Sequence, residues 1–317
     1  MSPAGATTIY GDLDVEVELN APIGADSWFA TGGTADTLVH PANPDVLAEI
    51  MRRCRRTETP LRVLGDGANL LVSDQGVDGI VVKLDADAFS KVSFNAEGEL
   101  YLLEAGAGVK MSALIKDAER RGLAGLAHMA GIPASIGGAI RMNAGGRYGA
   151  IGDTIHSVRC LARNGETKVY LGEELRFEYR STNIPDPVIL SAVFNVEQQD
   201  PVKLRKQLVE IYAYKKSTQP LGDKSAGCMF RNPIDPDTGE RVSAGAIIDR
   251  CGLKGLRVGS AEVSNLHANF IAIDRGGRAD DAIELSRLVA QRVKEERGIT
   301  IEREVVIWNR EDDSTSI

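Results

Sequence analysis

Cysteine and histidine are scarce in this 317-residue chain, which holds four of each. The cysteines are far apart and form no CxxC pair; they are Cys54, Cys160, Cys228 and Cys251. This spacing favours reduced thiols, as in a cytoplasm, over a disulfide framework or a zinc site. The histidines do not cluster either, so we expect no metal site.

The chain also has no excess of positive charge and no long hydrophobic run. Its formal net charge is −8 and its pI is about 5.2, which argues against general nucleic-acid binding but not against a small anionic ligand. No apolar run is long enough to span a bilayer. The N-terminus has neither a basic start nor an apolar core, so we expect no secretion signal and a cytoplasmic protein.

Glycine, in contrast, is concentrated in one stretch, residues 131–149, GIPASIGGAIRMNAGGRYG. Six glycines lie here, and Arg141 and Arg147 are the only charged residues. A mobile surface loop is the alternative, but it would be richer in Lys, Glu and Ser and would not interleave its glycines with Ile and Met. Glycine lets a backbone approach a ligand closely. We therefore interpret this stretch as an ordered ligand-binding segment.

A second glycine-rich segment, residues 65–74, reads GDGANLLVSD and follows a short apolar strand. Gly65 and Gly67 match the start of the dinucleotide fingerprint GxGxxG. Leu70 occupies the third glycine position, and a strand rather than a helix follows, so a Rossmann fold is rejected on context. A strand–turn–strand can still present N–H groups to a pyrophosphate. We favour a phosphate-binding loop over a plain hairpin.

The other patterns mix helices and strands in an α+β manner. Residues 1 to about 20 resemble a loose lead-in. The helix predictions are 44–54 with Asn43 as N-cap, 112–121 ended by Gly122, 202–216, and a helix from Asp280 as N-cap to Gly298. Asn164-Gly165 predicts a hairpin turn, and the sequence EREVVIW a last strand.

Six separated motifs occur in the order typical of one flavoenzyme family. They are GDGANLLVSD, GLAGLAHMAGIPASIGGAIRMNAGGRYG, FEYRSTNIP, QPLGDKSAGCMFRNP, AGAIIDRCGLKGLRVGSAEVSNLHANFI and EREV. Over residues 20–309 the chain therefore resembles the UDP-N-acetylenolpyruvoylglucosamine reductases (UDP-N-acetylmuramate dehydrogenases), of the shorter type.

This resemblance implies an α+β fold, with a two-subdomain FAD-binding module of the vanillyl-alcohol-oxidase (PCMH) type and a C-terminal α+β substrate domain. The expected divisions are residues 20–84 for FAD-binding subdomain 1, 85–200 for FAD-binding subdomain 2 and 201–310 for the substrate-binding domain. We expect a monomer that contacts neither nucleic acid nor membrane.

The resemblance also implies a reaction in peptidoglycan precursor synthesis. NADPH reduces noncovalent FAD, and the enolpyruvyl ether of UDP-N-acetylglucosamine then enters the same cleft. The reduced flavin delivers hydride to C3, and protonation of C2 gives UDP-N-acetylmuramate. The alternatives are another FAD-dependent sugar or alcohol oxidoreductase of the same superfamily, or an FAD-binding paralogue with impaired catalysis.

Three catalytic residues follow from the family motifs. Arg180 matches the arginine that binds the substrate carboxylate, and Glu304 matches the catalytic glutamate, with Glu302 as a nearby alternative. Cys228 stands where the family usually has a serine that protonates C2. A thiol can also donate a proton. The alternative for Cys228 is a small buried cysteine without a role.

The motifs also imply binding residues. The expected FAD contacts are Gly65, Asp66, Gly67, Ala68, Asn69, Leu70, Ile132, Pro133, Ala134, Ser135, Gly137, Gly138, Asn143 and Ala144, the second group through backbone atoms. Ala134 departs from a commoner glycine, and we expect it to be tolerated. The expected substrate contacts are Tyr179, Lys216 and Asn232. Lys215 is the residue most easily confused with Lys216.

Overall fold

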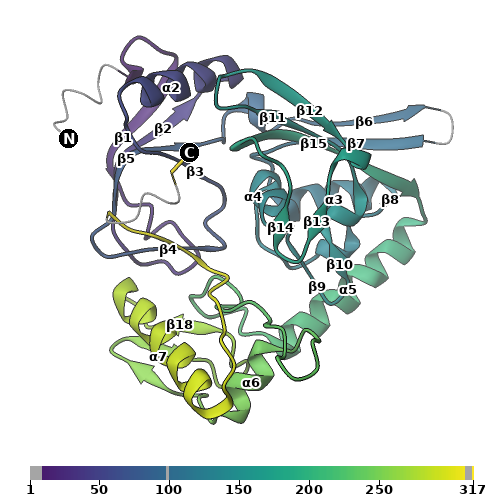
Figure 1. Cartoon of the computed structure of the whole chain (residues 1–317). Coiled ribbons are helices and arrows are strands. Elements are labelled where there is room, and N and C mark those ends of the chain that lie inside the picture. The colour runs from purple at the N-terminus through teal and green to yellow at the C-terminus, as the bar shows by residue number, and fades with distance from the viewer. Residues whose placement is uncertain (1–8, 98–99, 311–315) are drawn as a thin grey trace.

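The computed structural model describes residues 9–97, 100–310 and 316–317. Two sheets with their helices form one half of the molecule, and a smaller helical and stranded unit lies below them (Figure 1). The chain crosses between the halves at α5, Pro201–Thr218, and again at its C-terminal end. This mixture of helices and strands confirms the α+β class.

The first sheet has the strand order β1-β2-β5-β3. Its strands are β1 (Val15–Ala21), β2 (Ala35–Pro41), β3 (Leu61–Leu64) and β5 (Val77–Lys83). β1 is antiparallel to β2, so the prediction of a loose lead-in is wrong from Val15 onward. Helix α2, Pro44–Arg56, begins as predicted, with the Asn43 side chain accepting hydrogen bonds from the N–H groups of Asp45 and Val46.

The second sheet has the order β12-β11-β15-β7-β6. Its strands are β6 (Val92–Glu97), β7 (Leu100–Gly106), β11 (Ile155–Leu161), β12 (Thr167–Leu171) and β15 (Val188–Gln198), with β8 (Leu123–Ala124) paired to the end of β15. Helix α3, Met111–Arg121, ends at Gly122, whose φ of 68° places it in the left-handed region. Both this helix end and the hairpin at Asn164-Gly165 are confirmed.

The glycine-rich stretch folds into short ordered elements between these sheets. They are α4 (Ile136–Arg141), β9 (Gly145–Gly146) and β10 (Gly149–Ala150), and the hairpin of β13 (Phe177–Glu178) and β14 (Ser181–Thr182) follows later. Single 3-10 turns complete this half: Asp87–Phe89, Ala127–Met129, Ile151–Thr154 and Gly172–Glu174. One hydrophobic core runs through both sheets and includes Ile136 and Ile140 of α4. The stretch is thus packed, as predicted.

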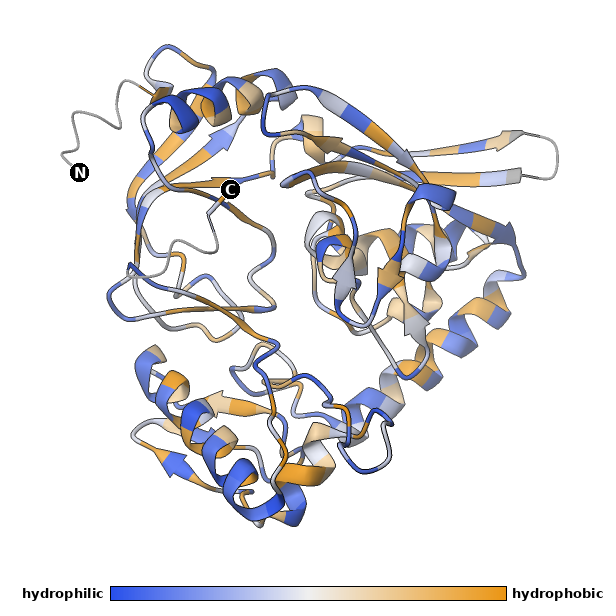
Figure 2. Cartoon of the chain, in the orientation of Figure 1, coloured by the Kyte–Doolittle hydropathy of each residue, from blue (hydrophilic) through white to orange (hydrophobic). Residues whose placement is uncertain are grey.

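The C-terminal unit has its own core. It contains α6 (Ala244–Arg250), β16 (Arg257–Val258), β17 (Ala261–Val263), β18 (Ile271–Ile273) and α7 (Ala279–Arg297). Apolar and charged residues alternate along α7 (Figure 2), and its buried face, with Leu285, Val289 and Val293, packs on the three-stranded sheet.

The sequence predicted Asp280 as the N-cap of α7, and this prediction is wrong. Asp280 lies inside the first turn, and Arg278, the residue directly before the helix, makes no capping hydrogen bond with its side chain. The carboxylate of Asp74, two residues after β4 (Leu70–Val72), accepts hydrogen bonds from the N–H of Ala279 at 3.0 Å and of Asp280 at 3.4 Å. A residue 205 positions away thus caps this helix and joins the two halves.

The last strand, β19 (Val306–Trp308), returns to the first half and pairs in parallel with β4 (Leu70–Val72), Val306 opposite Leu70. The divisions at residues 84 and 200 remain an interpretation, because this strand leaves the C-terminal unit. Within the described residues, no helix combines the length and apolarity needed to cross a membrane.

Candidate active site

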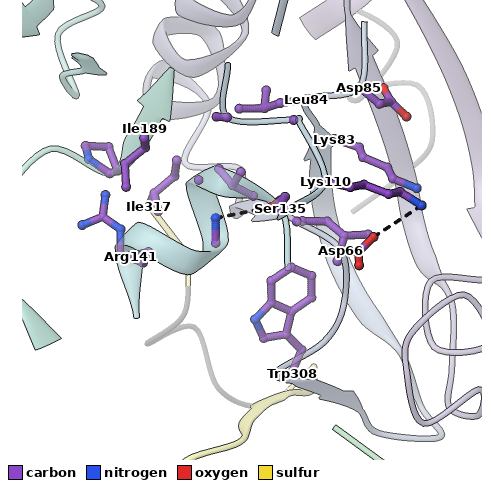
Figure 3. Close-up of a pocket in the computed structure, with 18 residues that line it drawn as sticks. Asp66, Lys83, Leu84, Asp85, Lys110, Ser135, Arg141, Ile189, Trp308 and Ile317 are labelled. Carbon is purple, nitrogen blue, oxygen red and sulfur yellow. Dashed lines mark hydrogen bonds and ion pairs between the residues drawn. The ribbon is translucent and has the colours of Figure 1, made fainter. Parts of the chain in front are cut away.

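A cavity of about 380 Å³ lies where the glycine-rich segments, α5 and the C-terminal strand meet. Its walls come from residues 63–70, 131–135, 138–139, 142, 144–148, 180, 214–215, 219, 226–228, 270, 304, 306 and 308. A second cavity of about 320 Å³ adjoins it and shares Gly65, Ser135 and Trp308. Figure 3 shows this second cavity, with Asp66, Lys83 and Lys110 on one side and Arg141, Ile189 and Ile317 on the other.

The loop of residues 65–69 presents main-chain N–H groups. Among the described residues, no protein acceptor receives a hydrogen bond from these groups. The loop is held by its carbonyls instead: Gly67 O accepts from Trp28 N, and Asn69 O accepts from Val306 N at 3.1 Å. Gly67 has a φ of 65°, which glycine adopts without strain. Successive free N–H groups in such a turn form an anion-binding concavity.

The wall formed by residues 131–138 is different, because several of its N–H groups are already bonded. Ile132 donates to Met129 O, Gly137 to Ala107 O, and Gly138 to Ser135 Oγ. Glycine is needed here for space: a Cβ on Gly137 would lie 3.0 Å from that of Ala107. The segment therefore serves as a close-packed wall, and these N–H groups are not available to a ligand.

The expected FAD contacts fall mostly on the two cavities. All six residues of 65–70, together with 132–135, Gly138 and Ala144, line the larger cavity, and Gly137 lines the adjoining one. Asn143 lines neither, because its side chain points away into the protein. The residues present fit a dinucleotide cofactor with a pyrophosphate.

Arg180 and Glu304 meet at the larger cavity, although 124 residues separate them. Arg180 Nε donates to Glu304 Oε1 at 2.5 Å, and the two side chains are 20% and 10% exposed. Arg180 lies in the two-residue turn between β13 and β14, with a φ of 55°. Such a backbone conformation is rare for arginine and is typical of functional sites.

Burial raises the pKa of the Glu304 carboxyl, while the neighbouring Arg180 and Arg231 oppose this rise. Burial, and after it the nearby Glu304 carboxylate, raise the pKa of the Cys228 thiol to about 12, although Arg180 opposes this rise. The Cys228 thiol lines the same cavity and stays protonated at neutral pH. Such a thiol is a proton donor and a poor nucleophile.

Backbone pairing brings Cys228 and Glu304 together. Glu304 N donates to Met229 O, and Arg231 N donates to Glu302 O, both at 2.8 Å. On the other side, the buried Asn269 side chain bonds the N–H and the carbonyl of Phe230. Glu302 therefore lies on the pairing strand but not on the cavity, which favours Glu304 over Glu302.

Tyr179 and Asn232 lie outside the lining of either cavity. The Tyr179 hydroxyl accepts a hydrogen bond from Asn232 N at 3.0 Å. The Arg241 guanidinium covers the Tyr179 ring at 4.1 Å from its centre, and Arg180 lies on the ring at 5.3 Å. The two predicted substrate residues thus contact each other and join the β13–β14 hairpin to the C-terminal unit.

Lys215, not Lys216, lines the cavity. Lys215 is buried, its Nζ donates to Ala130 O at 2.5 Å, and burial lowers its pKa to about 8. Lys216 is exposed. Neighbouring residues on a helix point about 100° apart, and here Tyr214 and Lys215 face the cavity while Lys216 points to the exposed side of α5.

Sequence reasoning also missed several lining residues. Phe270 and Trp308 line the larger cavity; Phe270 lies in the motif that ends in HANFI, and Trp308 ends the predicted strand EREVVIW. Among the described residues, no group of three metal-binding side chains occurs.

Comparison with known proteins gives consistent matches. Residues 219–308 match the family model "UDP-N-acetylenolpyruvoylglucosamine reductase, C-terminal domain", and residues 35–170 match "FAD binding domain". The UDP-N-acetylenolpyruvoylglucosamine reductase of Syntrophobacter fumaroxidans is 35% identical over 96% of this chain and 88% of its own length. The enzyme of that name from Gloeobacter violaceus is 38% identical over 89% and 93% of the two chains.

A solved structure agrees with these matches. The crystal structure of UDP-N-acetylenolpyruvylglucosamine reductase from Thermus caldophilus has a TM-score of 0.76 and 36% identity to this chain. The match covers 94% of this chain and all of the Thermus chain.

Proposed function

The chain belongs to the UDP-N-acetylenolpyruvoylglucosamine reductase family, and from this premise we propose that it reduces UDP-N-acetylglucosamine enolpyruvate to UDP-N-acetylmuramate with NADPH. FAD is its noncovalent cofactor, and the product is a peptidoglycan precursor. The observation that supports this best is the convergence of Arg180, Cys228 and Glu304 on one cavity beside the free N–H groups of residues 65–69.

The two cavities together would hold FAD. Residues 65–69 would bind its pyrophosphate through main-chain N–H groups, and residues 131–138 would form the wall against it. FAD, when bound, supplies the hydride chemistry of the reaction. Trp308, which borders both cavities, helps to exclude water from them.

Arg180 binds the carboxylate of the enolpyruvyl group. Its guanidinium stabilises the negative charge that develops as hydride reaches C3 and an enolate forms at C2. Glu304 orients the guanidinium through the 2.5 Å hydrogen bond. Because burial raises its pKa, Glu304 is also suited to hold a proton against the substrate carboxylate.

Cys228 supplies the proton. Its S–H bond breaks as the new C–H bond forms at C2, and the thiolate then regains a proton from solvent. The raised pKa keeps this thiol loaded at neutral pH. The proton moves from sulfur to carbon because the enolate formed at C2 is a stronger base than a thiolate.

Lys215 is the cation best placed for the substrate diphosphate. It lines the cavity from α5, and no carboxylate pairs with it among the described contacts. A phosphate anion beside it would raise its lowered pKa again. Tyr179 and Asn232 then act by fixing the wall of the site. We place this reaction in the cytoplasm, where NADPH is available, and infer a monomer.

An assay on the purified protein tests the proposal. The protein should be yellow, release one FAD per chain on denaturation, and oxidise NADPH in a manner that depends on the enolpyruvyl substrate. Flavin that stays covalently attached would favour a sugar or alcohol oxidase. FAD binding without substrate-dependent turnover would favour an impaired paralogue. Cys228, which replaces the family's usual serine, is the feature that suggests this alternative.

A further inference from the structure

The turn that carries Arg180 needs external support. Glu178 and Ser181 pair across the hairpin, and Tyr179 and Arg180 form its two-residue tip. Arg180 has a φ of 55°, so its backbone is in a region that arginine rarely adopts. A two-strand hairpin of two residues each does not hold such a tip by itself. Its position must come from contacts with the rest of the protein.

Two contacts hold the tip from the C-terminal side. Tyr179 accepts a hydrogen bond from Asn232 N, and Arg180 donates to Glu304. Both involve the tip residues and residues of the C-terminal unit. Neither fixes the hairpin relative to the wall of residues 131–138, against which the flavin would lie.

Asn143 provides that connection. Its Nδ2 donates to Glu178 O at 2.8 Å, and its Oδ1 accepts from Gly152 N at 3.1 Å. The residue is 6% exposed and has a φ of 39°. It lies just after α4, between Met142 and Ala144, both of which line the larger cavity. We call residues 131–144, most of which line the two cavities, the cofactor wall. The Asn143 side chain therefore joins the cofactor wall directly to Glu178, the residue before the Tyr179–Arg180 tip.

We propose that Asn143 is a positioning residue for Arg180: it fixes the β13–β14 hairpin at the distance from the cofactor wall at which Arg180 meets both Glu304 and the substrate carboxylate. This role rests on the proposed function. It differs from the cofactor contact expected for Asn143 from the sequence, because its side chain is bonded to the hairpin and faces neither cavity.

Asn143→Asp is the sharpest variant. It keeps the size, the tolerance of positive φ and the acceptor for Gly152 N, but it removes the donor to Glu178 O and sets a carboxylate against that carbonyl. Displacement of a catalytic group by a fraction of an ångström slows the step that uses it, here on the order of 10- to 100-fold. The affected step is flavin oxidation by the enolpyruvyl substrate. Flavin reduction by NADPH should change less than about twofold, since Arg180 acts on substrate charge.

The anchor, meaning the attachment of the β13–β14 hairpin by the Asn143 side chain, can also be tested without turnover. In hydrogen exchange, amides of residues 177–182 should exchange faster in Asn143→Asp, while those of α4 keep their protection. Asn143→Gly tolerates the positive φ and removes both side-chain bonds, so it should give the same pattern if Asn143→Asp fails to fold. Asn164→Asp, at an exposed hairpin turn, is the matched control and should change neither quantity.

A double-mutant cycle decides between positioning and general support. In an Arg180→Ala background, Asn143→Asp should cause no further loss in the oxidative half-reaction, because the group that it positions is gone. Additive losses, equal slowing of both half-reactions, or weaker FAD binding as the only change would overturn the proposal. Absence of enolpyruvyl turnover in the wild type would instead refute the proposed function, and unchanged exchange of residues 177–182 would then still refute the anchor.

Discussion

Cys228 combines a cavity position with a pKa raised to about 12, which suits a proton donor. We expect Cys228→Ser to retain turnover, because a hydroxyl fills the same place. Cys228→Ala should bind FAD and be reduced by NADPH, but form product on the order of 10²-fold more slowly, the range that general acids contribute. With deuterated flavin, recovered substrate from the Ala variant should carry deuterium at C3.

The same raised pKa predicts how the thiol reacts with reagents. Alkylation by iodoacetamide requires the thiolate, so Cys228 should react much more slowly than a free cysteine at pH 7.5 and faster as the pH rises. Full turnover by Cys228→Ala with an unchanged pH profile would assign the proton to another group or to water.

Lys215 predicts a pH dependence of stability. Its pKa is lowered from 10.5 to about 8 in the folded protein, so between these values the unfolded chain binds more protons. Stability of the apoprotein should therefore rise with pH through this window, and the full cost of burying the charge, about 3 kcal/mol, is present below pH 8. Lys215→Met should remove this rise and stabilise the apoprotein at pH 7.

Urea unfolding at pH 7 and at pH 9.5 measures this effect. Lys216→Met is the control, and it should change neither stability nor its pH dependence, because Lys216 is exposed. Lys215→Met should also raise the KM for the sugar nucleotide, whereas Lys216→Met should not. The opposite pattern would restore the sequence prediction of Lys216.

At the scale of elements, the two glycine-rich segments are built to contact each other. A Cβ on Gly65 would lie 2.7 Å from Ser135 Oγ, the atom that caps α4 by accepting from Gly138 N. Gly65→Ala should therefore push the loop of residues 65–69 away from α4 and weaken FAD binding about tenfold or more, a loss of roughly 1.4 kcal/mol.

A second substitution separates crowding from other causes. Ser135→Ala removes the Oγ that the new methyl would meet, and the next atom of Ser135 lies 3.9 Å away. The double variant should bind FAD more tightly than Gly65→Ala alone, although loss of the cap costs about 1 kcal/mol in stability. Quenching of FAD fluorescence on titration into apoprotein measures the FAD affinity of the single and the double variant. No recovery in the double variant would mean that the glycine is needed for its backbone and not for space.

At the scale of the whole molecule, the Arg180–Glu304 pair joins the two halves. Arg180→Lys keeps the charge but loses the fork that binds a carboxylate, and Glu304→Gln keeps the shape but loses the charge. Each should slow flavin oxidation by the substrate by about 10²- to 10³-fold, as for removal of other transition-state stabilisers, with little change in reduction by NADPH. Stopped-flow measurement of the two half-reactions tests this, and equal losses in both would identify a structural pair.

Local chemistry, which the sequence carries in full, determined the elements and the motifs. Asn43 begins α2 and Gly122 ends α3 because a cap acts on residues within one turn of the chain. The motifs identified the cavity walls because each glycine-rich loop carries in its own sequence the glycines that its backbone needs. Only tertiary structure decided which groups converge. Asp74 in place of Asp280 caps α7, Lys215 in place of Lys216 faces the cavity, and Asn143 turns toward Glu178. These choices depend on how helices and strands dock across about 200 residues of sequence, a long-range geometry that no local pattern encodes.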